Sequence, residues 1–179
     1  MSKKAVLLVN LGSPDSTKVA DVRRYLDEFL MDKYVIDAPF LIRLMVVKCF
    51  VLPFRPKKSA EAYETIWWKE GSPLIVLSQR LLKLVQSKCN LPVGLGMRYG
   101  NPSIYQGLKE LIEENPDLDE VLMFPLYPHY AMATTTTVVE KTKEVIAKYF
   151  PKLKLSYIES YYDYEPYIDA LVNSVKVNK

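Results

Sequence analysis

The stretch MRYGNPSI, residues 97–104, decides the fold because it joins two different hydrophobic patterns. The run that leads into it and overlaps its first two residues, residues 93–98, is predominantly apolar and typical of a buried strand. Apolar residues after it recur at every third or fourth position, as on one face of a helix. A strand followed directly by a helix is the repeating unit of an α/β protein. Arg98 and Tyr99 then lie at the carboxyl end of a strand, where such proteins form ligand crevices.

The same succession of strand and helix repeats along the chain. Short apolar runs predict further strands at residues 5–9, 120–126 and 154–158. Helical patterns lie at residues 19–30, 40–52, 60–68, 73–85, 104–112, 134–149 and 168–175. Because strands that are apolar on both sides must be covered on both sides, we expect a three-layer α/β fold, with a four-stranded parallel sheet and helices on both faces. No repeat or linker divides the chain, so we expect a single domain over residues 1–179.

The composition is that of an ordinary globular protein, with 49% hydrophobic and 25% charged residues among 179. A net charge of +3 is too small to indicate nucleic-acid binding. Cys49 and Cys89 are far apart and form no CxxC motif, which favours reduced thiols in a reducing compartment.

The sequence shows neither a signal-peptide pattern nor an apolar run of the roughly 18 residues that a membrane-spanning helix needs. The nearest approach is residues 40–52, which Arg43 and Lys48 interrupt. We therefore expect a cytoplasmic protein. We also expect residues 40–52 to form a helix that is buried on most sides, because apolar residues surround nearly its whole circumference.

Three positions near strand ends and turns are candidates for ligand contact, and each has a simpler structural interpretation. Arg98 follows an apolar strand, so it is either held in an ion pair or contacts a ligand. The first strand ends in NLGSP, residues 10–14, without the GxGxxG fingerprint of a dinucleotide site. This segment is either a tight turn or the rim of a crevice into which Leu11 points. Arg55, in RPKK, lies either in a solvated basic turn or in a grip for a carboxylate.

Aromatic residues are concentrated just before the sequence GSP at residues 71–73. Tyr63, Trp67 and Trp68 fall at helix-like spacing, where aromatic residues usually belong to a core. Two adjacent tryptophans cannot both face one core, however. One of them should therefore line a surface or groove, which would suit a flat apolar ligand.

The remaining polar candidates are weaker. His129 is the only histidine, and the sequence around it offers no partner nucleophile or second metal ligand, so we predict a structural role. The four threonines at residues 134–137 either cap the following helix or bind an anion at its start. Asp163 and Glu165 alone are too few for a metal site, and we predict none.

Taken together and in order, the motifs resemble the N-terminal half of the ferrochelatases. The matching pieces are LLVNLGSP at residues 7–14, Arg55 with Tyr63, GSPL at 71–74, GMRYGNP at 96–102 and PLYPHYA at 125–131. The resemblance covers essentially the whole chain. It implies a chelatase-like fold of two similar, flavodoxin-like α/β halves with a porphyrin cleft between them. Residues 1–179 would form the N-terminal half, and the C-terminal domain would be missing from this chain.

The resemblance also implies an activity and a set of site residues. The family's reaction is the insertion of Fe(II) into a porphyrin, protoporphyrin IX or coproporphyrin III, a lyase step of haem biosynthesis. Matching positions that line or support the porphyrin site are Leu11, Arg55, Tyr63, Ser72, Arg98 and Tyr99. The family's catalytic His and its partner Glu lie beyond residue 179. We therefore expect no catalytic residue, no resident cofactor and no enzymatic rate from this chain alone, with porphyrin and Fe(II) as substrates of the whole enzyme.

The chemistry of a porphyrin agrees with this implication. It is a flat apolar disc with carboxylates on its edge, so it needs aromatic or aliphatic walls and a few basic or hydroxyl groups at the rim. Arg55, Ser72 and Tyr63 would serve the propionates, and Leu11 with one tryptophan would press on the ring. Residues 40–52 resemble the family's lip at the pocket mouth, which would touch a membrane surface.

Two other functions are compatible with parts of the sequence. The first is a non-catalytic α/β module that binds a tetrapyrrole or another anion without turnover. The second is a flavodoxin-like nucleotide-binding domain, which the missing glycine-rich fingerprint disfavours.

Overall fold

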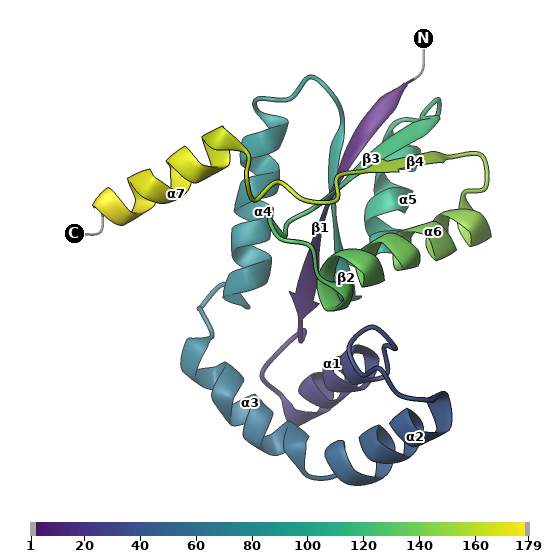
Figure 1. The fold of residues 1–179 in the computed structure, drawn as a ribbon, viewed down its shortest axis with the longest axis vertical. Coiled ribbons are helices and arrows are strands. Elements are labelled where there is room, and N and C mark those ends of the chain that lie inside the picture. The colour runs from purple at the N-terminus through teal and green to yellow at the C-terminus, as the bar shows by residue number, and fades with distance from the viewer. Residues whose placement is uncertain (1–2, 178–179) are drawn as a thin grey trace.

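The computed structural model describes residues 3–177. Its centre is a parallel sheet of four strands, in the order β2-β1-β3-β4 (Figure 1). The strands are β1 (Lys4–Ser13), β2 (Val93–Gly100), β3 (Glu120–Pro125) and β4 (Lys154–Tyr157). The α/β class and the four-stranded parallel sheet predicted from the sequence are confirmed.

Helices cover both faces of the sheet because β1 alternates apolar side chains between them. Leu7 and Val9 are fully buried against α5 (Ile104–Glu114) and α6 (Thr137–Tyr149). Leu8 points to the opposite face, where α4 (Pro73–Gln86) packs. Close contact between α5 and the sheet depends on Gly107, since a Cβ there would lie 2.3 Å from the Leu95 carbonyl oxygen.

A separate group of helices lies beyond the carboxyl ends of the strands, at the foot of Figure 1. We call it the helical lobe: α1 (Val19–Leu30), α2 (Phe40–Met45), the π-helical turn η1 (Val46–Val51) and α3 (Arg55–Ile66). Its buried cluster consists of Val22, Tyr25, Leu26, Leu30, Val47, Leu52, Ala60 and Tyr99. Tyr99 belongs to β2, so the end of this strand is part of the core of the lobe.

The last helix, α7 (Glu165–Val177), projects away from the sheet (Figure 1). Its apolar residues Ile168, Leu171, Val172 and Val175 are all exposed. The outer side of α4 is also apolar and exposed, with Leu77 and Leu84 about half accessible. None of the helices within residues 3–177 combines the length and apolarity that a membrane-spanning segment requires.

The expectation that residues 40–52 form a buried helix is wrong. The segment divides into α2 and η1, and Phe40, Leu41 and Phe50 are 59%, 74% and 64% exposed. It lies at the rim of the helical lobe and packs on one side only, through Val47 and Leu52. Hydrophobicity on all sides therefore reflects an exposed apolar surface here, not a buried helix.

Three other boundaries differ from the sequence predictions. β1 continues to Ser13 because Gly12 and Ser13 still pair with the end of β2. The basic sequence RPKK is the first turn of α3, not a loop. α6 begins at Thr137 after a second π-helical turn, η2 (Met132–Thr136), and no threonine side chain caps it. The hydroxyl of Thr136, the residue at the cap position, lies 2.8 Å from the Tyr130 hydroxyl instead.

Candidate functional site

The helical lobe contains an open hollow of about 380 Å³ between α1 and α3. Its lining residues are Tyr25, Leu26, Phe29, Arg55, Ser59, Ala62, Tyr63 and Ile66. The walls are thus aromatic and aliphatic, and one exposed guanidinium, that of Arg55, stands at the edge. A hollow of this volume is in the ordinary range for small-molecule sites. The structure brings together two of the residues predicted from the sequence, Arg55 and Tyr63.

The aromatic wall of this hollow is a chain of ring contacts. Tyr25 stacks on Phe29 with 6.1 Å between ring centroids, and meets Tyr63 edge-on at 6.4 Å. Tyr63 in turn meets Trp67 edge-on at 6.2 Å. Burial raises the pKa of the Tyr25 and Tyr63 hydroxyls, so both remain neutral hydrogen-bond donors at physiological pH. The wall is therefore apolar in its body and polar only at its hydroxyl groups.

Ser72 lies in a neighbouring, smaller hollow of about 170 Å³, which Trp67 also lines. Ser72 is only 6% exposed and precedes the first turn of α4, but its side chain makes no capping hydrogen bond. Trp67 therefore lines this smaller hollow and contacts the wall of the larger one through Tyr63. Its neighbour Trp68 faces outward instead, with the Arg80 guanidinium 5.6 Å from its ring centroid. One of the two adjacent tryptophans thus lines a groove and the other faces solvent.

Leu11 lies at the junction between the sheet and the helical lobe. It is half-buried and packs against the buried cluster of the lobe. The next residue, Gly12, has φ +102° and a Cβ there would lie only 1.8 Å from the Tyr99 carbonyl oxygen. This position requires glycine, which allows β1 to run close beside the end of β2.

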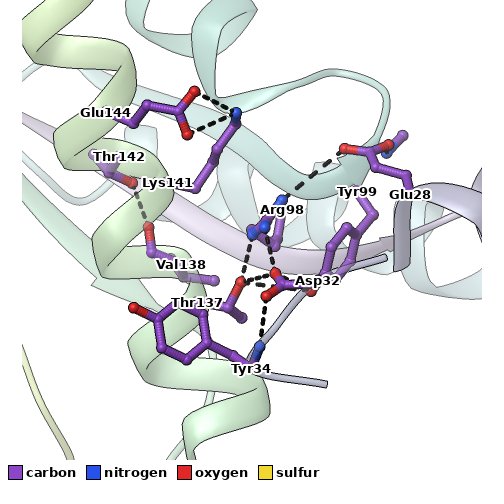
Figure 2. A network of polar contacts seen from close by, with 11 residues as sticks. Glu28, Asp32, Tyr34, Arg98, Tyr99, Thr137, Val138, Lys141, Thr142 and Glu144 are labelled. Atoms are coloured by element: carbon purple, nitrogen blue, oxygen red, sulfur yellow. Dashed lines mark hydrogen bonds and ion pairs between the residues drawn. The ribbon is translucent and has the colours of Figure 1, made fainter. Parts of the chain in front are cut away.

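Arg98 belongs to a buried polar network at the carboxyl end of β2 (Figure 2). Its Nη2 forms an ion pair with Asp32 Oδ2, and its Nε donates to Thr137 Oγ1 at 2.6 Å. The guanidinium carbon lies 4.3 Å from the ring centroid of Tyr99. Of the two interpretations of Arg98, the ion pair is thus present in the structure. Its contact with a ligand remains a prediction.

Tyr99 is fully buried beside Arg98 and donates from Oη to Asp32 Oδ2 at 2.8 Å. Thr137 Oγ1 donates to the same carboxylate oxygen. Burial by itself would raise the pKa of the Asp32 carboxyl. The hydrogen bonds from Thr137, the Tyr34 backbone and Tyr99, with the charge of Arg98, outweigh it and lower that pKa. Asp32 is therefore a buried carboxylate that stays ionised.

No sequence pattern marks Asp32 or Thr137 as members of this network. The sequence offered an ion pair as one of two interpretations of Arg98, the other being contact with a ligand. The partner could not be chosen among 21 acidic residues, because Asp32 stands 66 positions before Arg98.

His129 is exposed and stacks on Tyr162, with 5.3 Å between ring centroids. Within residues 3–177 no three His, Cys, Asp or Glu side chains come together as metal ligands would. The described residues therefore offer aromatic walls and a basic rim, and no assembled metal centre.

Comparison with known proteins tests the resemblance. The family model Ferrochelatase matches residues 3–178. The chain is 50% identical over 175 residues to the ferrochelatase of Stutzerimonas stutzeri, covering 97% of this chain and 50% of the relative. The ferrochelatase of Azotobacter vinelandii is 51% identical over 175 residues, which cover 97% of this chain and 51% of the relative. The ferrochelatase of Pseudomonas paraeruginosa is 49% identical to this chain over 176 residues, which cover 98% of this chain and 51% of the relative.

The chain thus spans about half the length of the curated relatives it matches. Five short motifs in a fixed order predicted this relationship, and the match of the family model to nearly every residue confirms it. The chain belongs to the ferrochelatase family.

Proposed function

We propose that this chain is the N-terminal, porphyrin-binding part of a ferrochelatase, the lyase that inserts Fe(II) into protoporphyrin IX or coproporphyrin III in haem biosynthesis. The observation that carries the proposal is the aromatic hollow between α1 and α3 with Arg55 at its edge. A flat apolar ring with edge carboxylates matches aromatic walls beside an exposed guanidinium. Family membership over nearly the whole chain supports the same conclusion.

The six predicted residues take two kinds of role in this proposal. Arg55 pairs with a propionate, Tyr63 and Ser72 supply hydroxyl groups, and Leu11 contributes apolar surface. Arg98 and Tyr99 support the site from behind, because Tyr99 is fully buried and Arg98 already has an ion-pair partner.

The remaining chemistry belongs to the other half of the whole enzyme. Metal insertion requires two pyrrole N–H protons to leave, and this step needs a base at the ring face. His129, the only histidine here, is exposed and stacked on Tyr162, so we assign it no such role. We infer that a C-terminal domain supplies the family's His and Glu, while this chain supplies one porphyrin-binding wall. Fe(II) is then a substrate and not a resident cofactor.

The exposed apolar residues of α2 and η1 suggest how a hydrophobic porphyrin reaches the site. Phe40, Leu41 and Phe50 form an apolar lip at the rim of the helical lobe, and Lys57 and Lys58 follow on α3. Apolar residues beside cations favour peripheral contact with an anionic membrane surface. We therefore propose a cytoplasmic protein that associates with a membrane through this lip.

The decisive experiment is a titration of this chain with protoporphyrin IX, followed by absorbance of the Soret band. We expect saturable binding, weakened about fivefold by Arg55→Ala through loss of a partly exposed ion pair. Arg23→Ala is the matched control, since Arg23 is exposed on α1 and does not line the hollow. Equal binding by wild type and Arg55→Ala would contradict the assignment of Arg55.

The same complex distinguishes an enzyme part from a binding module. Fe(II) added without oxygen should not enter the bound porphyrin faster than in buffer, because the family's His and Glu lie outside this chain. Recovery of insertion on addition of the C-terminal half would support the enzyme. Failure to recover it would favour the alternative, a module that binds tetrapyrroles without turnover.

A further inference from the structure

The buried network around Asp32 lies directly behind the aromatic wall of the hollow. We propose that Asp32 is a positioning residue of the porphyrin site and acts on the wall through the hydroxyl of Tyr99. This inference rests on the proposed function, because it assigns Asp32 a role in porphyrin affinity.

Asp32 holds three parts of the fold together with one carboxylate. Its Oδ2 accepts from Arg98 and Tyr99 at the end of β2 and from Thr137 in the first turn of α6. Its Oδ1 accepts from the Tyr34 backbone N–H at 2.8 Å. The side chain is only 4% exposed, so the loss of any of these donors would leave a buried carboxylate oxygen with fewer hydrogen bonds. The connection between α1 and α2 is thereby fixed to the sheet.

Tyr99 transmits this position to the hollow. Its ring meets Phe29 edge-on, with 5.2 Å between centroids, and Tyr25 edge-on at 6.4 Å. Phe29 and Tyr25 both line the hollow, and Tyr25 in turn contacts Tyr63. Edge-to-face ring contacts depend on relative orientation, so a displaced Tyr99 ring displaces the wall.

The charge of Asp32 is needed as well as its shape. Arg98 pairs with Asp32 while its guanidinium lies over the Tyr99 ring, and Glu28 is its other carboxylate neighbour, with 4.0 Å between Nη1 and Oε1. An asparagine at position 32 would leave the guanidinium without its nearer counter-charge. The guanidinium would then move toward Glu28 and no longer hold the Tyr99 ring in place.

The test is a protoporphyrin titration of the Asp32→Asn chain at a temperature far below unfolding, fitted for both Kd and sites per chain. A residue that only stabilises the fold lowers the number of sites and leaves the Kd of the folded molecules unchanged. A positioning residue raises Kd, here about tenfold, with the number of sites maintained. The circular dichroism that the protein induces in the Soret band should also change, because it reports the orientation of the ring against its walls.

The matched control is Asp117→Asn. It removes the same charge from an exposed ion pair with Lys3, next to the opposite end of the sheet, and should change neither Kd nor the Soret signal. Wild-type Kd and wild-type Soret circular dichroism in Asp32→Asn would overturn the inference and leave the proposed function intact. Absence of porphyrin binding by the wild-type chain would overturn both.

Tyr99→Phe provides a second variant if Asp32→Asn folds poorly. It keeps the ring and removes only the hydroxyl that Asp32 holds. We expect a smaller increase in Kd in the same direction, and a double variant no weaker than Asp32→Asn alone. Additive losses would show that Asp32 acts independently of Tyr99 and would overturn this part of the inference.

Discussion

Two regions of the molecule, the core beneath α5 and α6 on one hand and the helical lobe on the other, contain different kinds of side chain. The first is aliphatic: Leu7, Val9 and Leu108 are completely buried. The second is aromatic, open on one side, and joined to the sheet by a buried charge network. The difference indicates that the aliphatic core supplies stability, whereas the helical lobe presents the open aromatic surface to which the proposed function assigns the ligand.

The largest effect should come from removing side-chain volume from the aliphatic core. Leu108→Ala should lower the free energy of unfolding by about 3 kcal/mol, since Leu108 is fully buried and its loss leaves a cavity. The Kd of the folded fraction for protoporphyrin should not change. Urea unfolding measures the free energy of unfolding. Leu77→Ala, on the outer side of α4, is the control and should lower that free energy far less. A large change in Kd would show that the two regions are not separate.

The next effect concerns the network between the two regions. Asp32→Asn should cost about 2 kcal/mol at pH 7, because it leaves a largely buried Arg98 without its nearer carboxylate. The folded state lowers the pKa of Asp32, so its contribution exists above the unfolded value, near 4. That contribution is lost as the pH falls through the lower folded value.

The difference in unfolding free energy between wild type and Asp32→Asn should therefore shrink below about pH 4. Urea unfolding at pH 7 and at successive values below pH 4 measures it, and all other carboxyl groups are common to both proteins. A difference that stays constant over this range would mean that folding does not lower the pKa of the Asp32 carboxyl.

The smallest effect on stability should come from the lip. Phe50→Ser should change the unfolding free energy by less than about 0.5 kcal/mol, since Phe50 is 64% exposed. The Phe50→Ser protein should nevertheless bind vesicles of anionic lipid less well than the wild type, as cosedimentation would show. Val47→Ser, in the same π-helical turn but fully buried, should instead destabilise the protein strongly. Unchanged vesicle binding by Phe50→Ser would remove the lip from the proposed membrane contact.

The two regions also differ in how far the sequence predicts them. The aliphatic core was predictable because its strands are continuous apolar runs, and a parallel sheet buries both of their faces. Arg55 and Tyr63 were predicted together only through the family resemblance, because the helix that places them on one side, α3, was expected to begin at residue 60 and not at Arg55. The exposure of residues 40–52 could not be predicted from the sequence, because apolarity alone does not distinguish a buried face from an apolar surface.

The charge network could not be predicted for a different reason. Thr137 and Asp32 meet Arg98 across 39 and 66 positions of the chain. Such contacts depend on how the elements pack, and no local pattern around Asp32 marks it as the partner. The sequence therefore left an ion pair and a ligand contact open for Arg98, and only the fold identified Asp32 as the ion-pair partner.

The place of Tyr99 in the fold has a consequence for how the chain folds during synthesis. β1 is made first, but it has no neighbouring strand until β2 emerges from the ribosome, far later in the sequence. The helices of the lobe are complete before then, yet their buried cluster still lacks Tyr99. At about 5–20 residues per second, both regions wait several seconds for the same short segment. We therefore expect the sheet and the lobe to become ordered together, when residues 93–100 leave the ribosome.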